Sequence, residues 1–181
     1  GQDAIHVGES DIDVIMGAGP IGLMHVLLAR LRGARRIIMS EPSAMRRQQA
    51  LAMGADRALD PTVDDLHAIV MEDTSGRGAD VIITAAPSKA AQESAVGIAA
   101  RWGRINFFGG LPRQDSTIRI DANAVHYKEL IVTGTTACST YDCLRAKEIV
   151  DSGRVDLSPI VSKTYPLTEA PAAFEAAQDL T

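Results

Sequence analysis

The chain has 181 residues, of which 46% are hydrophobic, and a formal net charge of -5 at pH 7. This length supports one well-packed domain with a small appendage. The acidic balance argues against a nucleic-acid partner, whose phosphates need clustered Lys and Arg. The sequence contains no run of about 18 apolar residues and no basic, apolar leader, so we expect a cytoplasmic protein without membrane contact.

Short apolar runs alternate with amphipathic stretches, as expected for βαβ units. Six strands are predicted, at 13–17, 35–40, 57–60, 80–86, 104–109 and 130–134. Helices are predicted at 20–32, 43–53, 63–74, 88–101 and 140–152. Four of the strands are apolar at nearly every position, which indicates burial by helices on both faces. The predicted fold class is therefore α/β, with a doubly wound parallel sheet.

Helix starts and stops support this division. Pro20 suits a first helical turn, Ser43 and Ser88 suit N-caps, and three glycines suit helix ends: Gly33, Gly54 and Gly153. The connection 109–129 is long, contains the extended-looking piece TIRI, and does not resemble a plain crossover helix. After Gly153 the alternation ends in one extended segment and one helix. We therefore predict a main domain at 1–155 and a separate segment at 156–181.

The strongest motif is GAGPIG, at residues 17–22. It follows the first strand directly and opens the first helix, which is the context that distinguishes a dinucleotide-binding turn from a chance GxGxxG. Gly17 permits the tight turn, Gly19 permits close approach of a pyrophosphate, and Gly22 permits close packing of the helix on the sheet. The helix N-terminus, with Pro20 and Ile21, offers backbone N–H groups to the phosphates.

An acidic residue, Glu41, lies 19 residues after Gly22, at the end of the second strand. A carboxylate there accepts hydrogen bonds from the adenosine ribose hydroxyls and repels a 2′-phosphate, which favours NAD over NADP. Arg46 and Arg47 follow closely. An arginine at this place binds a 2′-phosphate or stacks on adenine, so NADP stays open as an alternative.

The nicotinamide half of the cofactor is expected beyond the carboxyl ends of the fourth, fifth and sixth strands. Small residues follow these strands, at 85–88, 109–111 and 135–137. The positions chosen from them as cofactor contacts are Ala85, Ala86, Gly109, Gly110 and Thr135.

Other reactive residues offer little support for catalysis. Cys138 and Cys143 lack a second pair or a histidine at ligand spacing, so we predict reduced, structural thiols and no metal site. None of the tyrosines belongs to a Tyr-x3-Lys pair. His25 and His126 are expected to have structural roles, and Trp102 is expected to cap the edge of the core. No catalytic residue is predicted.

Several runs resemble the zinc-type medium-chain dehydrogenases, in particular the sorbitol, threonine and polyol dehydrogenase branch. They are GAGPIGLMHVLLARLRGARRIIMSEPSAMRRQQALAMGAD, GADVIITAAPS, GRINFFGGLP, HYKELIVTGTT and AKEIVDSGRVDLSPIVSKTYPLTEAPAAFEAA, and they cover nearly the whole chain. The resemblance implies a Rossmann fold with strand order 3-2-1-4-5-6. It also implies NAD(H)-dependent oxidation of a secondary alcohol to a ketone.

The resemblance carries cofactor-contact roles to Gly19, Pro20, Ile21, Gly22, Glu41 and Arg46, and to the segments around Ala85, Gly109 and Thr135. The family usually has Asp where this chain has Glu41, and often a more Gly-rich entry to the fifth strand than Trp102 provides. Its catalytic zinc belongs to a domain that precedes the glycine motif. No such ligands occur here, so we expect an excised NAD-binding fragment that is inactive alone and whose residues 156–181 return toward that domain.

The family commonly pairs its sixth strand with a second subunit, so a homodimer is expected through LIVTG. In the full-length protein the expected substrate is a small alcohol or polyol. Two alternatives remain. An S-adenosylmethionine-dependent methyltransferase also has a Gly-rich first turn and an acid after strand two, but its sheet ends in an antiparallel hairpin. A non-catalytic nucleotide-sensing Rossmann module is the other.

Overall fold

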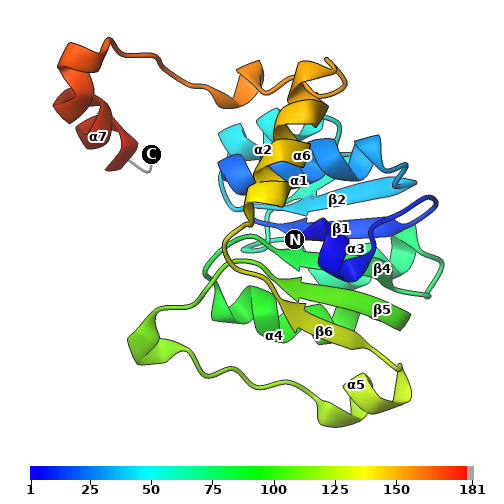
Figure 1. Ribbon diagram of the computed structural model, residues 1–181. Coiled ribbons are helices and arrows are strands. Elements are labelled where there is room, and N and C mark those ends of the chain that lie inside the picture. Colours follow the sequence, from blue (N-terminus) through cyan, green and yellow to red (C-terminus); the bar gives the residue numbers. More distant parts are fainter. Residues whose placement is uncertain (179–181) are drawn as a thin grey trace.

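The protein forms a six-stranded sheet of order β3-β2-β1-β4-β5-β6, in which all the strand pairs are parallel (Figure 1). This computed structural model describes residues 1–178. The strands are β1 (Ile12–Met16), β2 (Arg36–Ser40), β3 (Arg57–Leu59), β4 (Ala79–Thr84), β5 (Ala99–Phe107) and β6 (Ile131–Gly134). The sheet confirms the predicted α/β fold class and the strand order 3-2-1-4-5-6.

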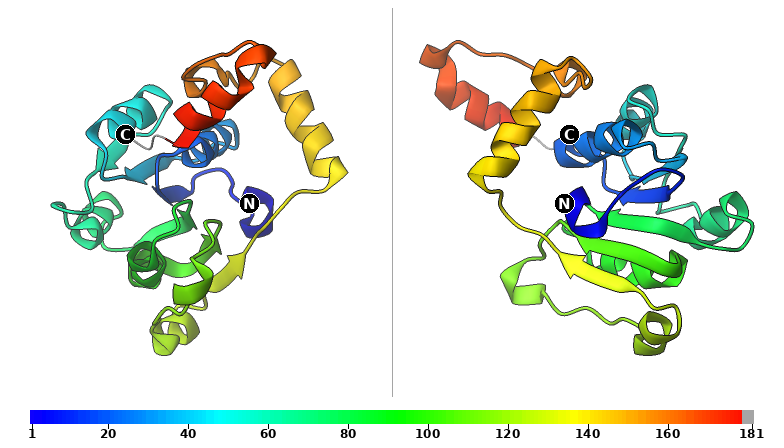
Figure 2. Two further views of the ribbon diagram at one scale, coloured as in Figure 1. Left: turned by 90° about the vertical axis from the view of Figure 1, so that its left-hand side faces the viewer. Right: turned by 45° about the vertical axis from the view of Figure 1, so that its right-hand side comes forward.

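Helices cover both faces of the sheet (Figure 2). They are α1 (Pro20–Leu31), α2 (Ala44–Ala52), α3 (Leu66–Asp73), α4 (Lys89–Ile98), α5 (Ala122–Tyr127), α6 (Thr140–Asp151) and α7 (Ala170–Gln178). Alternate residues of β1 belong to two separate cores. Ile15 packs with Val26 of α1 on one face, whereas Val14 packs with Val70 of α3 and Val96 of α4 on the other. This two-sided burial explains why the strand sequences are apolar without alternation.

The predicted helix boundaries are largely confirmed. Pro20 is the first residue of α1, and the hydroxyls of Ser43 and Ser88 accept N–H bonds as the caps of α2 and α4. The glycines expected to end helices, Gly33, Gly54 and Gly153, all have positive φ. The weakest predicted strand, at 57–60, is present as β3.

One boundary was wrong. Residues 88–101 were expected to be helical and the next strand to start at 104, but α4 ends at Ile98 and β5 begins at Ala99. Ala99 pairs with Ala79 of β4, and the register then shifts so that Arg104 pairs with Val81. Ala99 and Ala100 are each 1% exposed. Burial in the sheet therefore overrides the helix propensity of these alanines.

The expected role of Trp102 was also wrong. Its side chain is 65% exposed and lies in the irregular part of β5 with φ +59, so it does not cap the core. The indole N–H donates instead to the Glu129 carboxylate at 2.9 Å, and the Arg101 guanidinium lies 5.3 Å from the ring centroid. A large apolar side chain at a turn was misread as core because Glu129, which accepts its indole N–H, lies 27 residues away.

The connection between β5 and β6 is irregular, as expected, except for a 3₁₀ turn at Arg113–Asp115 and the short α5. TIRI, at 117–120, belongs to no helix or strand. In the described part of the tail, the expected helix is present as α7, and the segment before it has two 3₁₀ turns and no strand. Helix α7 stands away from the sheet in Figure 1 and in the right-hand view of Figure 2.

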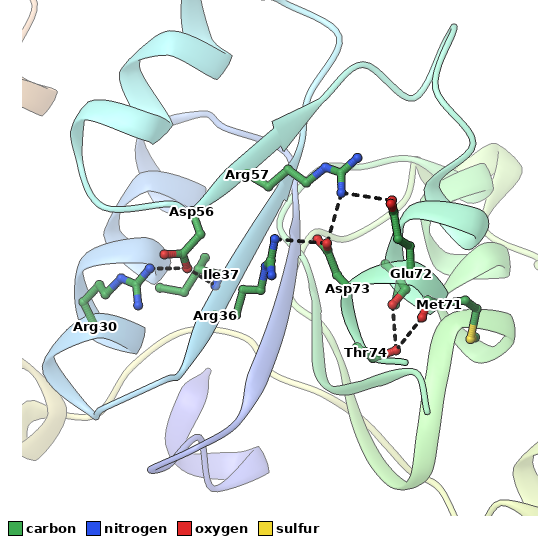
Figure 3. A network of polar contacts seen from close by, with 10 residues as sticks. Arg30, Arg36, Ile37, Asp56, Arg57, Met71, Glu72, Asp73 and Thr74 are labelled. Carbon is green, nitrogen blue, oxygen red and sulfur yellow. Dashed lines mark hydrogen bonds and ion pairs between the residues drawn. The ribbon is translucent and has the colours of Figure 1, made fainter. Parts of the chain in front are cut away.

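Charged side chains gather at the amino ends of the strands (Figure 3). Asp73, at the end of α3, pairs at 3.0 Å with both Arg36 of β2 and Arg57 of β3. Asp56 pairs with Arg30 of α1 and also accepts the Ile37 N–H at 2.6 Å. These ion pairs therefore lie at the amino ends of the strands. The glycine turns lie at the opposite, carboxyl ends.

No helix in the part of the chain that the structure describes is long and apolar enough to cross a membrane.

Candidate functional site

The turn between β1 and α1 forms the centre of the candidate site. Gly17 has φ +105, a conformation that side chains rarely adopt, and its N–H donates to the Ser40 carbonyl at 2.8 Å. A Cβ on Gly22 would lie 1.8 Å from the Gly17 carbonyl oxygen, so α1 can pack on its own turn only with glycine there. The sequence predicted the tight turn at Gly17, whereas at Gly22 it predicted close packing of the helix on the sheet and not this contact with the turn.

Gly19 differs from these two glycines because it faces open space. A Cβ built there meets nothing within 4 Å. Gly19 is also the N-cap of α1, whose first-turn N–H groups have no partner within the helix, as in any α-helix. The turn therefore presents backbone donors and the positive end of a 12-residue helix to a vacant approach, which is the arrangement that binds a phosphate.

Glu41 follows β2 and is 5% exposed. Its Oε2 accepts the Ala18 N–H at 2.7 Å, and its Oε1 accepts the Ser43 N–H at 2.9 Å. The carboxylate thus joins the glycine turn to the turn that starts α2. The sequence predicted a contact with ribose but missed this one, because a hydrogen bond to a backbone N–H 23 residues earlier has no sequence signal. Each oxygen keeps a second lone pair for a ligand hydroxyl.

The two arginines after Glu41 have different surroundings. The Arg47 guanidinium donates to the Glu41 and Pro42 carbonyls at 2.8 and 2.6 Å and pairs with Asp60 at 3.1 Å, which fixes it in the structure of the turn. Arg46 lies in the first turn of α2, where its backbone N–H reaches the Ser43 hydroxyl at 3.5 Å.

Backbone contacts bring the other predicted positions to the glycine turn. The Ala85 N–H donates to the Met16 carbonyl at 2.8 Å, and the Gly109 N–H donates to the Thr84 carbonyl at 2.7 Å. A Cβ on Gly109 would lie 2.6 Å from the Ala86 carbonyl oxygen, and one on Gly17 would lie 2.9 Å from the Ala86 Cβ. Gly17, Ala86 and Gly109 therefore pack backbone to backbone. Gly110, by contrast, has no atom within 4 Å of a built Cβ.

Three buried polar residues support this edge and were missed by the sequence analysis. The Gln92 side chain donates to the Gly109 carbonyl at 2.9 Å. Asn106 is 0% exposed, and its Oδ1 accepts the Thr135 hydroxyl at 3.1 Å. The Asn106 amide nitrogen and the Thr84 hydroxyl have no partner within the described residues. For Thr84 and Asn106, a polar residue inside an apolar strand was the available signal.

A cavity of about 770 Å³ lies beside this edge, between α1, the 3₁₀ turn Gln2–Ile5 and α6. Of the predicted contacts only Thr135 lines it; the others lie at the turns described above. Phe108 lines it as well, and the His25 ring packs edge-on against Phe108 at 4.8 Å. Burial lowers the pKa of His25 to about 4, which fits the packing role predicted for it.

The two cysteines are reduced, but the expectation of structural thiols was wrong, because both side chains are exposed. Their sulfur atoms lie 3.5 Å apart. Among the described residues, no three His, Cys, Asp or Glu side chains gather as metal ligands. His126 lies on α5, before β6, and packs edge-on against Tyr127 at 4.8 Å.

Comparison with known proteins assigns this chain to a protein family. Residues 20–152 match the family model described as zinc-binding dehydrogenase. An L-threonine 3-dehydrogenase of Caldanaerobacter subterraneus is 34% identical over 163 residues, which cover 89% of this chain and 46% of that protein. The chain thus spans about half the length of the curated relatives it matches.

Solved structures agree with the fold. A zinc-binding dehydrogenase from Sinorhizobium meliloti, bound to NADP, has a TM-score of 0.87 and 28% identity, with 94% of this chain and 50% of that one covered. A short chain alcohol dehydrogenase from Escherichia coli, complexed with NADH, has a TM-score of 0.87 at 20% identity, with 99% and 52% covered. The second likeness bears on the fold alone.

Proposed function

Because this chain belongs to the zinc-binding dehydrogenase family, we propose that it is the part of an alcohol or polyol dehydrogenase that binds NAD(H). The observation that carries the proposal is the turn at 17–22, where Gly19 leaves an open approach to the N-terminus of α1. A bound nicotinamide cofactor would accept or supply the hydride, and this chain would position it. All five pairs of neighbouring strands are parallel, and β6 pairs parallel with β5, unlike the antiparallel hairpin that ends a methyltransferase sheet.

The proposed contacts follow the carboxyl edge of the sheet. The β1–α1 turn would hold the pyrophosphate, Glu41 would hold the adenosine ribose, and the residues after β4, β5 and β6 would hold the nicotinamide half. The residues involved are Gly17, Gly19, Pro20, Ile21, Gly22, Glu41, Arg46, Ala85, Ala86, Gly109, Gly110 and Thr135.

Substitution at Gly19 tests this placement. A Cβ there has open space within the protein but would occupy the approach of the pyrophosphate. Gly19→Ala should therefore keep the unfolding midpoint of the parent chain and weaken NADH binding at least about tenfold in a calorimetric titration. Gly97→Ala is the matched control, since its Cβ also meets nothing within 4 Å but lies on α4, and NADH affinity should be unchanged. Equal NADH affinity of the parent chain and Gly19→Ala would contradict the proposed phosphate site.

We further propose NAD rather than NADP as the preferred cofactor, because the Glu41 carboxylate repels a 2′-phosphate. The parent chain should bind NADH at least about tenfold more tightly than NADPH. Arg46→Ala separates the two roles open to Arg46: loss of affinity for both cofactors indicates stacking on adenine, whereas loss for NADPH alone indicates a phosphate contact. Preference for NADPH by the parent chain would contradict the proposal.

The remaining parts of the proposal concern the whole enzyme. Residues 1–155 form the cofactor domain, and 156–181 lead toward a zinc-containing catalytic domain, which would polarise the alcohol for hydride transfer. The 181 residues would then bind NAD(H) without oxidising alcohols, and turnover by this polypeptide with metals excluded would contradict that. We also propose a homodimer through the free edge of β6.

A further inference from the structure

The two cysteines of this chain lie together at the turn between β6 and α6. Cys138 precedes the N-cap Ser139, and Cys143 lies in the first turns of α6. Their sulfur atoms are 3.5 Å apart, and both side chains are exposed. A disulfide needs about 2.05 Å between sulfurs, so the pair must close by about 1.5 Å, in a turn whose residues are not buried.

The residues between the cysteines hold this geometry. Ser139 and Asp142 form a reciprocal capping box, in which the Ser139 hydroxyl receives the Asp142 N–H at 3.2 Å and the Asp142 carboxylate receives the Ser139 N–H at 2.8 Å. Such a box fixes the backbone at the start of a helix. Little conformational entropy therefore remains to be lost when the sulfurs join.

From this geometry we infer that Cys138 and Cys143 form a redox-active dithiol, which low-molecular-weight disulfides such as oxidised glutathione convert to an intramolecular disulfide. The site lies three residues after Thr135, and Cys138 lines the cavity beside the carboxyl edge. The inference concerns the covalent state of the turn and does not depend on the proposed cofactor.

The reaction balances in two exchange steps. The Cys138 thiolate attacks one sulfur of oxidised glutathione, and the first glutathione leaves as a thiolate. The Cys143 thiolate then attacks the Cys138 sulfur, the mixed disulfide breaks, and the second glutathione leaves. The two protein thiols lose two electrons, and their two protons pass to the two glutathione thiolates.

The order of these steps follows from the contact between the sulfurs. The hydrogen bond with Cys138, and then the charge of Cys138, raise the pKa of Cys143, so Cys143 is the poorer first nucleophile. Once Cys138 is in a mixed disulfide, its thiol hydrogen bond and its charge are gone. Cys143 then ionises more readily and resolves the adduct.

The test oxidises the chain and counts its free thiols. The protein is incubated with mixtures of reduced and oxidised glutathione of rising oxidised fraction, quenched with acid, alkylated and weighed by intact mass spectrometry. Both alkylation sites should disappear together, with the loss of two hydrogens and no retained glutathione. The peptide that contains residues 138–143 should carry the internal link.

Single substitutions provide the matched controls. Cys143→Ser should stop at the first step and retain one glutathione on Cys138, and Cys138→Ser should retain one glutathione on Cys143. The inference is overturned if the parent chain keeps two alkylatable thiols at the same glutathione mixture that glutathionylates Cys143→Ser. Two retained adducts, or disulfide-linked dimers instead of an internal link, overturn it as well.

Ser139→Ala tests why the sulfurs are close. It removes the capping box but keeps both cysteines, and loss of such a cap costs about 1 kcal/mol, equivalent to roughly fivefold. Closure to the disulfide should therefore slow by about three- to fivefold at a fixed glutathione ratio. An unchanged rate would show that the cap does not hold the pair.

Discussion

Strands β1 and β6 have similar apolar sequences but different surroundings. All five residues of β1 are buried, whereas none of the four residues of β6 is buried. The helices that follow repeat this difference, with five buried residues in α1 and none in α6. β1 lies between β2 and β4, and β6 pairs only with β5. An apolar run thus predicts a strand, but neighbours in the sheet decide whether it is buried.

The same difference in burial divides the chain into a buried central region and an exposed edge region. Within the described residues, the buried apolar side chains all precede residue 106 except Val155. Beyond that point, large apolar side chains are exposed, among them Ile131 at 52%, Leu144 at 55% and Phe174 at 71%. The central region carries the glycine turn at 17–22, and the edge region carries the exposed apolar side chains.

The largest effect is expected at the turn that joins β1 to α1. Gly22→Ala places a Cβ 1.8 Å from the Gly17 carbonyl oxygen, so the turn must shift and both stability and the proposed NADH site should be lost. We expect a loss of about 3–5 kcal/mol in chemical unfolding. Gly97→Ala, also helical but unobstructed, should gain about 0.5–1 kcal/mol. Equal stability of the two variants would mean that the close packing is not required.

The next effect concerns a carboxyl group inside β1. Asp13 is 0% exposed and neither of its carboxyl oxygens has a hydrogen-bond partner in the described structure. Burial, and then the charge of Asp11, raise its pKa to about 8; Asp80 adds to this, whereas Arg104 and Arg30 act in the opposite direction. The folded chain therefore keeps a proton that the unfolded chain releases above pH of about 4.

The sign of the pH dependence follows. The stability that protonated Asp13 contributes is fully present below the unfolded pKa and is lost as pH rises through the folded pKa near 8. Asp13→Asn removes the titration, so its stability relative to the parent should rise between about pH 4 and 8 and then level off. We expect a change on the order of 2–3 kcal/mol, below the full shift because local hydration relieves a buried charge. Parallel stability curves for the two proteins would contradict the assignment.

The sequence predicted the central region better than the edge because the central signals are local. Gly17, Gly19 and Gly22 act within one turn, and the caps at Ser43 and Ser88 act within three residues. Strand order and both faces of the sheet followed from these signals together with the family resemblance.

What the sequence missed depends on contacts between distant residues. The start of β5 is set by pairing of Ala99 with Ala79, and Glu41 is held by the Ala18 N–H. Such contacts connect positions whose local patterns do not reveal each other.

A third prediction sharpens the comparison at the free edge of β6. If the exposed edge pairs with a second copy, a charge on it should prevent pairing. Ile131→Lys should raise the dimer dissociation constant at least about tenfold in sedimentation equilibrium, and change monomer stability by less than about 0.5 kcal/mol. Val161→Lys is the control, because Val161 is exposed to a similar extent, 58%, but lies outside the sheet. A parent chain that stays monomeric at all concentrations would exclude this interface.

The smallest effect is expected at Trp102, the residue that the sequence placed in the core. Its indole contacts the exposed groups Glu129 and Arg101, and the hydrogen bonds of Trp102 and Arg101 lower the pKa of Glu129. Its φ of +59 is strained for every residue that has a side chain, and only glycine adopts it without strain. Trp102→Gly should therefore lose the surface contact but relieve the strain, and unfolding free energy should change by less than about 0.5 kcal/mol. A loss of several kcal/mol would show that the edge of β5 is as tightly packed as β1, and the contrast between centre and edge would then fail.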